Sequence, residues 1–234
     1  MVDAIFPHHH LDGGLAQHAG LSPRAWAKIV FIDAPVCDGC GAPQDFATGQ
    51  RCATCLAKPF AFARARAACV YDDASRGLVL RFKHGDAVDL GRLFARWIAR
   101  SARELLEDSD AVAPVPLHRG RLLRRRYNQA AEIARPLARM ARLQYLPDAL
   151  VRRRATASQG VKSGGARKRN VQGAFEVSET GALQVKGRRI LLIDDVLTTG
   201  ATAEACAKAL LKAGAREVRL AVVARVPTPR DLTI

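Results

Sequence analysis

The sequence predicts an α/β domain with a mainly parallel sheet flanked by helices, preceded by a small zinc-ribbon module. Two observations carry this prediction. One is an apolar run that ends in two adjacent acids and a glycine-containing turn, and the other is two pairs of closely spaced cysteines near the N-terminus. With 234 residues and 49% hydrophobic composition, the chain is long enough for one sizeable core and a small appendage.

The run Ile190–Ile193 is typical of a buried parallel strand. It is followed by Asp194 and Asp195, by a turn of small residues at Thr198–Thr202, and by a helical pattern over 203–213. A strand that feeds a helix through such a turn directs backbone N–H groups and the positive end of a helix at one point, which favours a phosphate. The carboxylates can accept hydrogen bonds from sugar hydroxyls or hold the waters of a metal. The segment therefore predicts a site for a phosphorylated ribose; the alternative is an ordinary turn with exposed acids.

Four cysteines, Cys37, Cys40, Cys52 and Cys55, form two C-x-x-C pairs separated by eleven residues, which is the spacing of zinc knuckles. Four thiolates make a closed tetrahedral site, so structural rather than catalytic zinc is expected. A disulfide pair is the alternative, which reducing conditions in the cytoplasm disfavour. A redox C-x-x-C is also disfavoured, because the motif occurs twice and opens no thioredoxin-like helix. The two other cysteines lie in apolar surroundings and are predicted core residues, Cys69 and Cys206.

The net charge of +15 is unevenly distributed along the chain. Between Arg119 and Arg169 there are thirteen arginines and two lysines against two acids. Such a segment favours a polyanion, whether pyrophosphate, a phosphorylated substrate or nucleic acid; a solvated basic surface is the alternative. No apolar run approaches the roughly 18 residues of a membrane span, and the N-terminus lacks the pattern of a secretory signal. We therefore expect a cytoplasmic protein without a membrane span.

The ordered set of motifs resembles the ComF/GntX family, whose members join cysteine knuckles to a type I phosphoribosyltransferase fold. The resemblance runs from about residue 26 to residue 226. Its landmarks are PVCDGCGAP (35–43), RCATCL (51–56), VYDDASRGLVLRFKHGD (70–86), PVPLHRGRLLRRRYNQA (114–130), TASQGVKSGGARKRNVQGAF (156–175) and RILLIDDVLTTGAT (189–202). The last of these is similar to the signature for 5-phosphoribosyl-1-pyrophosphate (PRPP) of type I phosphoribosyltransferases.

This resemblance implies three regions: a degenerate ribbon-like segment over 1–34, a four-cysteine zinc ribbon over 35–66, and a phosphoribosyltransferase domain over 67–234. Family members often carry an earlier cysteine ribbon, whereas the first region here contains no cysteine. Its histidines are possible metal ligands, although a ribbon that has lost its zinc is the favoured interpretation.

The resemblance also implies three groups of PRPP-binding residues. Those expected to act in the reaction are Asp194, Asp195, Arg167, Lys168 and Arg169. Those expected to bind the 5′-phosphate are Thr198, Thr199, Gly200, Ala201 and Thr202. Those expected to bind pyrophosphate are Lys83, Arg119, Arg126, Asn128 and Gln129. The flexible hood loop of the fold corresponds to 156–170 and would close over PRPP; a surface loop that contacts nothing is the alternative.

Other segments of the domain have weaker patterns. A strand is expected over Asp110–Pro116, and a helix over Asp89–Glu107. A further helix is expected to bury one face, which consists of Ala130, Ile133, Leu137 and Met140. Pro136 should kink or shorten that helix. Lys83 follows an apolar stretch, Leu78–Phe82, so a solvated strand end is the alternative to a ligand contact.

The implied reaction is transfer of 5-phosphoribose from PRPP to a nucleophile, with release of pyrophosphate and with Mg²⁺ held mainly by PRPP. Thr198 stands where purine-salvage enzymes often carry an acid, which disfavours a hypoxanthine-type acceptor. The family resemblance implies a part in DNA uptake during competence or in the use of DNA as a nutrient. No residue identifies the acceptor, and no pattern specifies the oligomeric state.

Two other functions compete with the enzyme. One is a non-catalytic PRPP-fold scaffold that binds single-stranded DNA or competence proteins. The other is a regulator that binds PRPP without turnover. The basic segment contains only two aromatic residues that could stack on bases, Tyr127 and Tyr145. This small number disfavours single-stranded DNA binding by base stacking.

Overall fold

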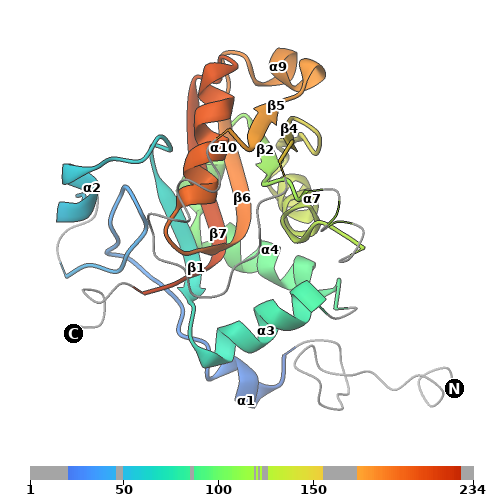
Figure 1. Cartoon of the computed structure of the whole chain (residues 1–234). Helices are drawn as coiled ribbons and strands as arrows, with labels where there is room; N and C mark the ends of the chain where they lie inside the picture. Colours follow the sequence, from blue (N-terminus) through green and yellow to red (C-terminus); the bar gives the residue numbers. More distant parts are fainter. Residues whose placement is uncertain are drawn as a thin grey trace, which may run out of the picture.

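The computed structural model describes residues 21–45, 50–84, 87–118, 120, 122, 126–154 and 173–227. The predicted architecture, a mostly parallel sheet with flanking helices, is confirmed (Figure 1). The strands are β1 (Ala65–Val70), β2 (Ala111–Pro114), β3 (Gln144–Tyr145), β4 (Leu150–Arg152), β5 (Phe175–Val177), β6 (Arg189–Leu197) and β7 (Glu217–Arg225). The helices are α1 (Pro23–Trp26), α2 (Ala53–Ala57), α3 (Asp73–His84), α4 (Leu90–Ser101), α5 (Arg103–Glu107), α7 (Gln129–Ala141), α9 (Glu179–Val185) and α10 (Ala201–Lys212).

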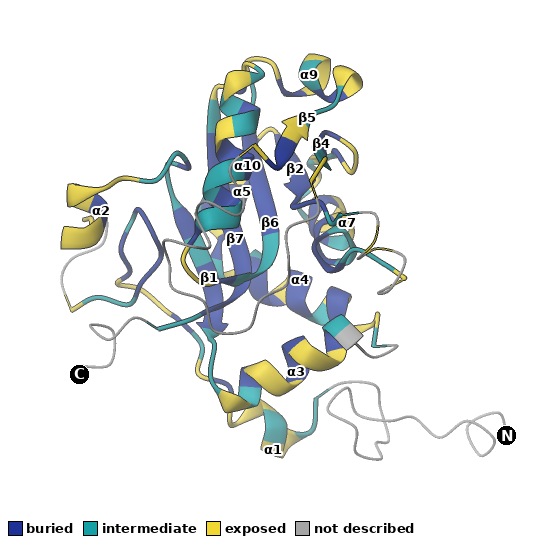
Figure 2. Cartoon of the chain, viewed as in Figure 1, coloured by how far each residue is buried: buried dark blue, intermediate teal, exposed yellow. Residues whose placement is uncertain are grey.

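Five parallel strands form the sheet, in the order β1-β7-β6-β2-β3. Both faces of the central strands are buried, and Figure 2 shows β7 and the first half of β6 in dark blue. These strands are accordingly nearly continuous apolar runs. Along β6 the side chains alternate: Leu191 and Ile193 pack with α4 and α7, whereas Ile190 and Leu192 pack with α10. A separate antiparallel pair, β4 with β5, lies on the α10 side.

Strand β6 is longer than the predicted run, because β7 pairs with it as far as Leu197. The two acids therefore lie inside the strand, near its carboxyl end. Helix α10 begins at Ala201, two residues before the predicted start, directly after Gly200 with its left-handed φ of +75°. Strand β2 is shorter than the predicted 110–116. The order strand, acids, turn and helix is as predicted.

Helices α4 and α5 replace the single helix predicted over 89–107. The break is at Ala102, where the backbone leaves the helical region with φ −120° and ψ 28°. Most of the apolar side chains expected to pack along 89–107 are nevertheless buried, whereas Leu93 is only partly buried. Those with 5% exposure or less are Leu90, Phe94, Trp97, Ile98 and Leu105. Cys69 and Cys206 are fully buried, as predicted.

Helix α7 continues to Ala141 past Pro136. Of the two effects expected of this proline, a kink or a shorter helix, the shorter helix is wrong, and the kink stays a prediction. A proline at this position leaves the carbonyl of Glu132 without its usual donor in the helix. Gly91 of α4 packs there so closely that an added Cβ would lie 2.8 Å from the Glu132 oxygen. The prediction for Met140 is also wrong, since this side chain is 48% exposed.

Before the cysteines, residues 29–32 run along β1. The N–H of Ile32 donates to the carbonyl of Ala68 (3.0 Å), and the N–H of Val70 donates to Val30 (2.8 Å). The cysteine-containing segment follows and includes α2, at the left of Figure 1, and β1 begins at Ala65. The first twenty residues, including the histidines considered as metal ligands, lie outside the described residues.

Candidate functional site

The carboxyl end of β6 carries the two adjacent acids predicted to bind ribose. One carboxylate oxygen of Asp194 accepts a hydrogen bond from the backbone N–H of Asp195 at 2.9 Å. Burial, and next the negative charge of Asp195, raise the pKa of Asp194 to about 7, although the positive charges of Lys83 and Arg152 oppose that shift. Burial and the neighbouring acid thus disfavour the ionised form of Asp194, which the nearby cations favour.

Lys83 lies in the last turn of α3, so the strand-end alternative is wrong. Its ammonium nitrogen is 2.9 Å from a carboxylate oxygen of Asp195, and the two side chains are 19% and 14% exposed. Two residues predicted to contact different parts of PRPP, its pyrophosphate and its ribose, are thus neighbours.

The turn after β6 leads into α10 with no side chain capping the helix. Thr198 and Thr199 are exposed, Gly200 is buried, and Ala201 and Thr202 form the first two helical positions. The first N–H groups of an α-helix have no acceptor within the helix. This helix start can therefore donate to an anion at the same sheet edge as the acids.

The end of the loop between β2 and α7, together with the first residue of α7, holds three of the predicted pyrophosphate residues. Arg126 is exposed and has a left-handed φ of 66°. The Asn128 side chain accepts from the N–H of Ala130 (3.1 Å) and donates to the carbonyl of Val115 (3.0 Å), so it caps α7 and ties the helix to the end of β2. Gln129 is 2% exposed. In this structure the Asn128 amide therefore supports the loop, and the Gln129 side chain is buried beside it.

Several predicted site residues lie outside the described residues, namely Arg119, Arg167, Lys168 and Arg169, together with the predicted hood loop.

Arg152 of β4 is a site residue that the sequence motifs did not indicate. Its charge lowers the pKa of Asp194, and its guanidinium lies 5.1 Å from the centroid of the Phe175 ring. It also lines a cavity of about 760 Å³ between the residues after β2, the start of α7 and β4, which Asn128 lines as well. The signal available in the sequence was the run Arg152–Arg154 directly before the predicted hood loop.

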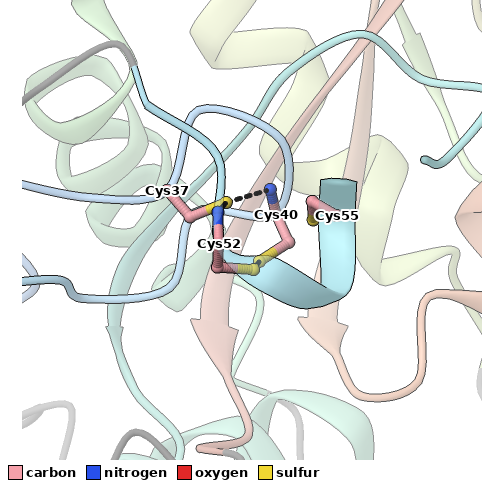
Figure 3. A group of neighbouring side chains, drawn as sticks. All are labelled: Cys37, Cys40, Cys52 and Cys55. Carbon is pink, nitrogen blue, oxygen red and sulfur yellow. Dashed lines mark hydrogen bonds between the residues drawn. The ribbon is translucent and has the colours of Figure 1, made fainter. Parts of the chain in front are cut away.

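The four N-terminal cysteines converge as predicted (Figure 3). Their sulfur atoms lie within 4.8 Å of one another, and the Cys40 and Cys52 sulfurs are 3.9 Å apart. Zinc–sulfur bonds of about 2.3 Å in a tetrahedron place sulfur atoms about 3.8 Å apart. The spacing therefore fits a zinc ion.

Cys37 accepts from the backbone N–H groups of Cys40 (3.5 Å) and Cys52 (3.2 Å). Hydrogen bonding with the Cys40 side chain, and next with the backbone of Cys52, outweighs burial and lowers the pKa of Cys37 to about 4. The pKa of Cys40 is raised instead, chiefly by its hydrogen bond with Cys37, and burial raises the pKa of Cys55 to about 12. Cys37 is therefore the thiol of this cluster that ionises most easily. All four cysteines are unbridged.

Charged residues join the cysteine segment to the sheet. Asp38, between the first two cysteines, pairs with Arg64 (2.8 Å) and Arg66 (3.0 Å), and Arg66 also pairs with Glu104 of α5 (2.6 Å). At the end of β7, a guanidinium nitrogen of Arg225 lies 3.9 Å from the Cys40 sulfur. This cation can offset part of the negative charge of a zinc–tetrathiolate group.

The parallel sheet carries paired acids at a strand end, beside a glycine turn that opens a helix. This arrangement defines the class of the protein: it is of the phosphoribosyltransferase type, with an attached cysteine cluster. A family model for the phosphoribosyl transferase domain matches residues 127–233. Among the described residues no helix is long and apolar enough to cross a membrane.

Relatives identify the family within that class. The chain is 34% identical over 199 residues to the DNA utilization protein YhgH of Escherichia coli (strain K12), covering 83% of this chain and 86% of that protein. It is 30% identical over 196 residues to competence protein F of Haemophilus influenzae, covering 82% and 85%. The chain therefore belongs to the ComF/GntX family. Among solved structures, it is similar to glutamine PRPP amidotransferase from B. subtilis, with a TM-score of 0.40 and 16% identity over 61% of this chain and 30% of that one.

Proposed function

We propose that this protein binds PRPP at the carboxyl edge of the sheet and transfers its 5-phosphoribosyl group to a nucleophile, with release of pyrophosphate. The observation that carries this proposal is the contact between Lys83 and Asp195 at 2.9 Å, at the sheet edge where α10 begins. Cation, acids and helix start together match the three charged or polar parts of PRPP.

Each part of the site has a role in this proposal. The backbone N–H groups at the start of α10, with the hydroxyls of Thr199 and Thr202, bind the 5′-phosphate. Asp194 and Asp195 accept hydrogen bonds from the ribose hydroxyls, and these bonds are stronger when the carboxylates are ionised. Lys83 leaves Asp195 to contact the pyrophosphate.

In the reaction, the bond between ribose carbon 1 and the pyrophosphate oxygen breaks, and its electron pair leaves with pyrophosphate. The nucleophile supplies the electron pair of the new bond to carbon 1. Lys83 and the arginines of the loop after β2 stabilise the charge that develops on the leaving group. Mg²⁺ bound with PRPP supplies further stabilisation of that charge.

We further propose that Cys37, Cys40, Cys52 and Cys55 bind a structural Zn²⁺. Their sulfur spacing and the N–H donors to Cys37 support this. Four protein ligands leave no open position for a substrate, which favours a role in folding over one in the reaction.

The names of the relatives, a DNA utilization protein and a competence protein, support a role in the uptake or use of DNA. We place the protein in the cytoplasm. A second candidate function is a PRPP-fold scaffold that binds single-stranded DNA. It is favoured by a row of arginines four residues apart on α4, Arg92, Arg96 and Arg100. Backbone binding of this kind weakens steeply as salt rises, so affinity that persists at high salt would contradict it.

The primary test is calorimetric titration of Mg²⁺–PRPP into the zinc-loaded protein and into Asp194→Asn/Asp195→Asn. We expect binding by the wild type that is lost in the double variant. The matched control Asp33→Asn, which removes an exposed carboxylate, should bind like the wild type. Absence of binding by folded wild type at millimolar PRPP would refute the enzyme and direct the search to nucleic acid.

A further inference from the structure

One aromatic side chain lies between the cysteine cluster and the turn that opens α10. Phe60 follows α2 and packs against the cluster that contains Cys37, Cys40 and Cys55. The same ring covers Gly200, since a Cβ added to that glycine would lie 2.7 Å from the ring carbon Cε1. Phe60 is supported by Phe62, a buried core residue whose ring stacks on it at 4.5 Å and 11°.

A backbone contact beside this ring reaches the first turn of α10. The N–H of Ala61 donates to a carboxylate oxygen of Glu204 at 2.6 Å. Glu204 also pairs with Lys208 at 2.9 Å. An acid in the first turn could compete with a bound phosphate for the helix N–H groups, but this carboxylate is held by the segment that follows the cysteines.

A third contact reaches the other end of the turn. Leu197, the last residue of β6, is the register partner of Arg225 in β7, and its carbonyl accepts from the N–H of Val226 at 2.9 Å. Arg225 in turn lies 3.9 Å from the Cys40 sulfur. The cysteine segment is therefore linked to the residues at both ends of Thr198–Thr202 as well as to Gly200 within it.

We infer that Phe60 is a positioning residue through which zinc binding at the four cysteines orders the turn proposed to bind the 5′-phosphate. This inference rests on the proposed function. The physical reason is that a closed zinc site supplies folding free energy to the segments that carry its ligands. Without the metal, Phe60 loses the ordered cysteine cluster on one side and keeps only the stacked Phe62 ring, so the glycine beneath it regains backbone freedom. Phosphate binding must then order the turn, and the affinity falls by that cost.

The coupling must be reciprocal, because linkage between two sites acts equally in both directions. Zinc should tighten PRPP binding, and PRPP should tighten zinc binding by the same factor. Couplings between sites are typically about 5- to 150-fold in affinity, and we expect a value in this range.

The test measures Mg²⁺–PRPP affinity by calorimetry in full-length, zinc-loaded protein and in Phe60→Ala, with the zinc content of each determined. We expect Phe60→Ala to keep one zinc per chain yet bind PRPP at least about fivefold more weakly than the wild type. Phe60→Leu, which keeps apolar bulk, should recover part of the affinity. The matched control is Leu56→Ala on α2, because Leu56 is 69% exposed, and it should bind like the wild type.

Removal of zinc completes a thermodynamic cycle. Chelation should weaken PRPP binding by the wild type and change the affinity of Phe60→Ala much less. PRPP should slow the transfer of zinc to a chelator in the wild type but not in Phe60→Ala. Wild-type PRPP affinity in zinc-loaded Phe60→Ala would overturn the inference.

Backbone hydrogen exchange separates this inference from the proposed function, because it needs no ligand. Amides of residues 198–204 should exchange faster in zinc-loaded Phe60→Ala than in the wild type, whereas Leu56→Ala should leave them unchanged. If the wild type binds no PRPP, the proposed function fails, and exchange alone decides whether the cysteine segment orders the turn. Unchanged exchange at these amides would overturn the coupling itself.

Discussion

Replacing Gly200 by alanine tests the close packing of the cysteine segment on the α10 turn. Two costs add. A left-handed backbone, here with φ of +75°, costs a residue that has a Cβ about 1–2 kcal/mol. The new Cβ would also lie 2.7 Å from the Phe60 ring, and such overpacking costs about 1–3 kcal/mol. Because Phe60 is only partly buried and its ring can tilt, we expect a total loss of about 2–3 kcal/mol of unfolding free energy.

Gly187→Ala supplies the matched control. Its φ of +72° is almost the same, but an added Cβ meets no atom within 4 Å. The backbone cost alone then applies, about 1–2 kcal/mol. Urea unfolding of both variants, in the wild-type and Phe60→Ala backgrounds, measures the difference. The extra loss at Gly200 should disappear when Phe60 is alanine. Equal losses for the two glycines would refute the reasoning, and so would an extra loss that persists without the ring.

Three further predictions concern the acids, their lysine and the helix crossing. Lys83→Met should weaken PRPP binding about tenfold, the lower end for a hydrogen bond to a charged group, because the cation proposed to contact the pyrophosphate is lost; unchanged affinity in calorimetry would contradict this role. The pKa of Asp194 is raised to about 7 from 3.8, so the folded state binds more protons than the unfolded state between those values, and this contribution to stability is lost as pH rises through about 7. Urea unfolding at about pH 5 and about pH 8 should therefore show a fall in stability that Asp194→Asn lacks, and parallel profiles would refute the assignment. Gly91→Ala should lose about 1–2 kcal/mol of unfolding free energy, since overpacking against Glu132 outweighs the gain of about 1 kcal/mol in helix propensity; a stabilised variant would show that α4 and α7 separate easily.

The sequence predicts best those parts of the protein that are formed by residues close together in the chain. The β6 strand, its acids and the following turn occupy one short stretch, and the cysteine spacing encodes its own geometry. These features lie where the sequence predicts them, because residues close together in the chain determine the geometry of each one.

Other features depend on contacts between distant segments. The run Leu78–Phe82 is too short for its period to separate strand from helix, so the helical position of Lys83 was ambiguous. The amides of Asn128 and Gln129 look like ligand donors in a motif, yet Asn128 caps a helix and Gln129 is buried. Phe60 belongs to no motif, and only the fold brings it to Gly200.

Residues 29–32 have a consequence for assembly. They occupy the edge of β1 that faces away from β7. There the N–H of Ile32 donates to the carbonyl of Ala68, and the N–H of Val70 donates to the carbonyl of Val30. An exposed strand edge is a template on which another chain can add a strand. Here the chain's own N-terminal segment already occupies that template next to Ala68 and Val70. A second copy or a partner strand that joined the sheet at this place would first have to displace these residues, so the protein carries its own protection against edge-to-edge association there.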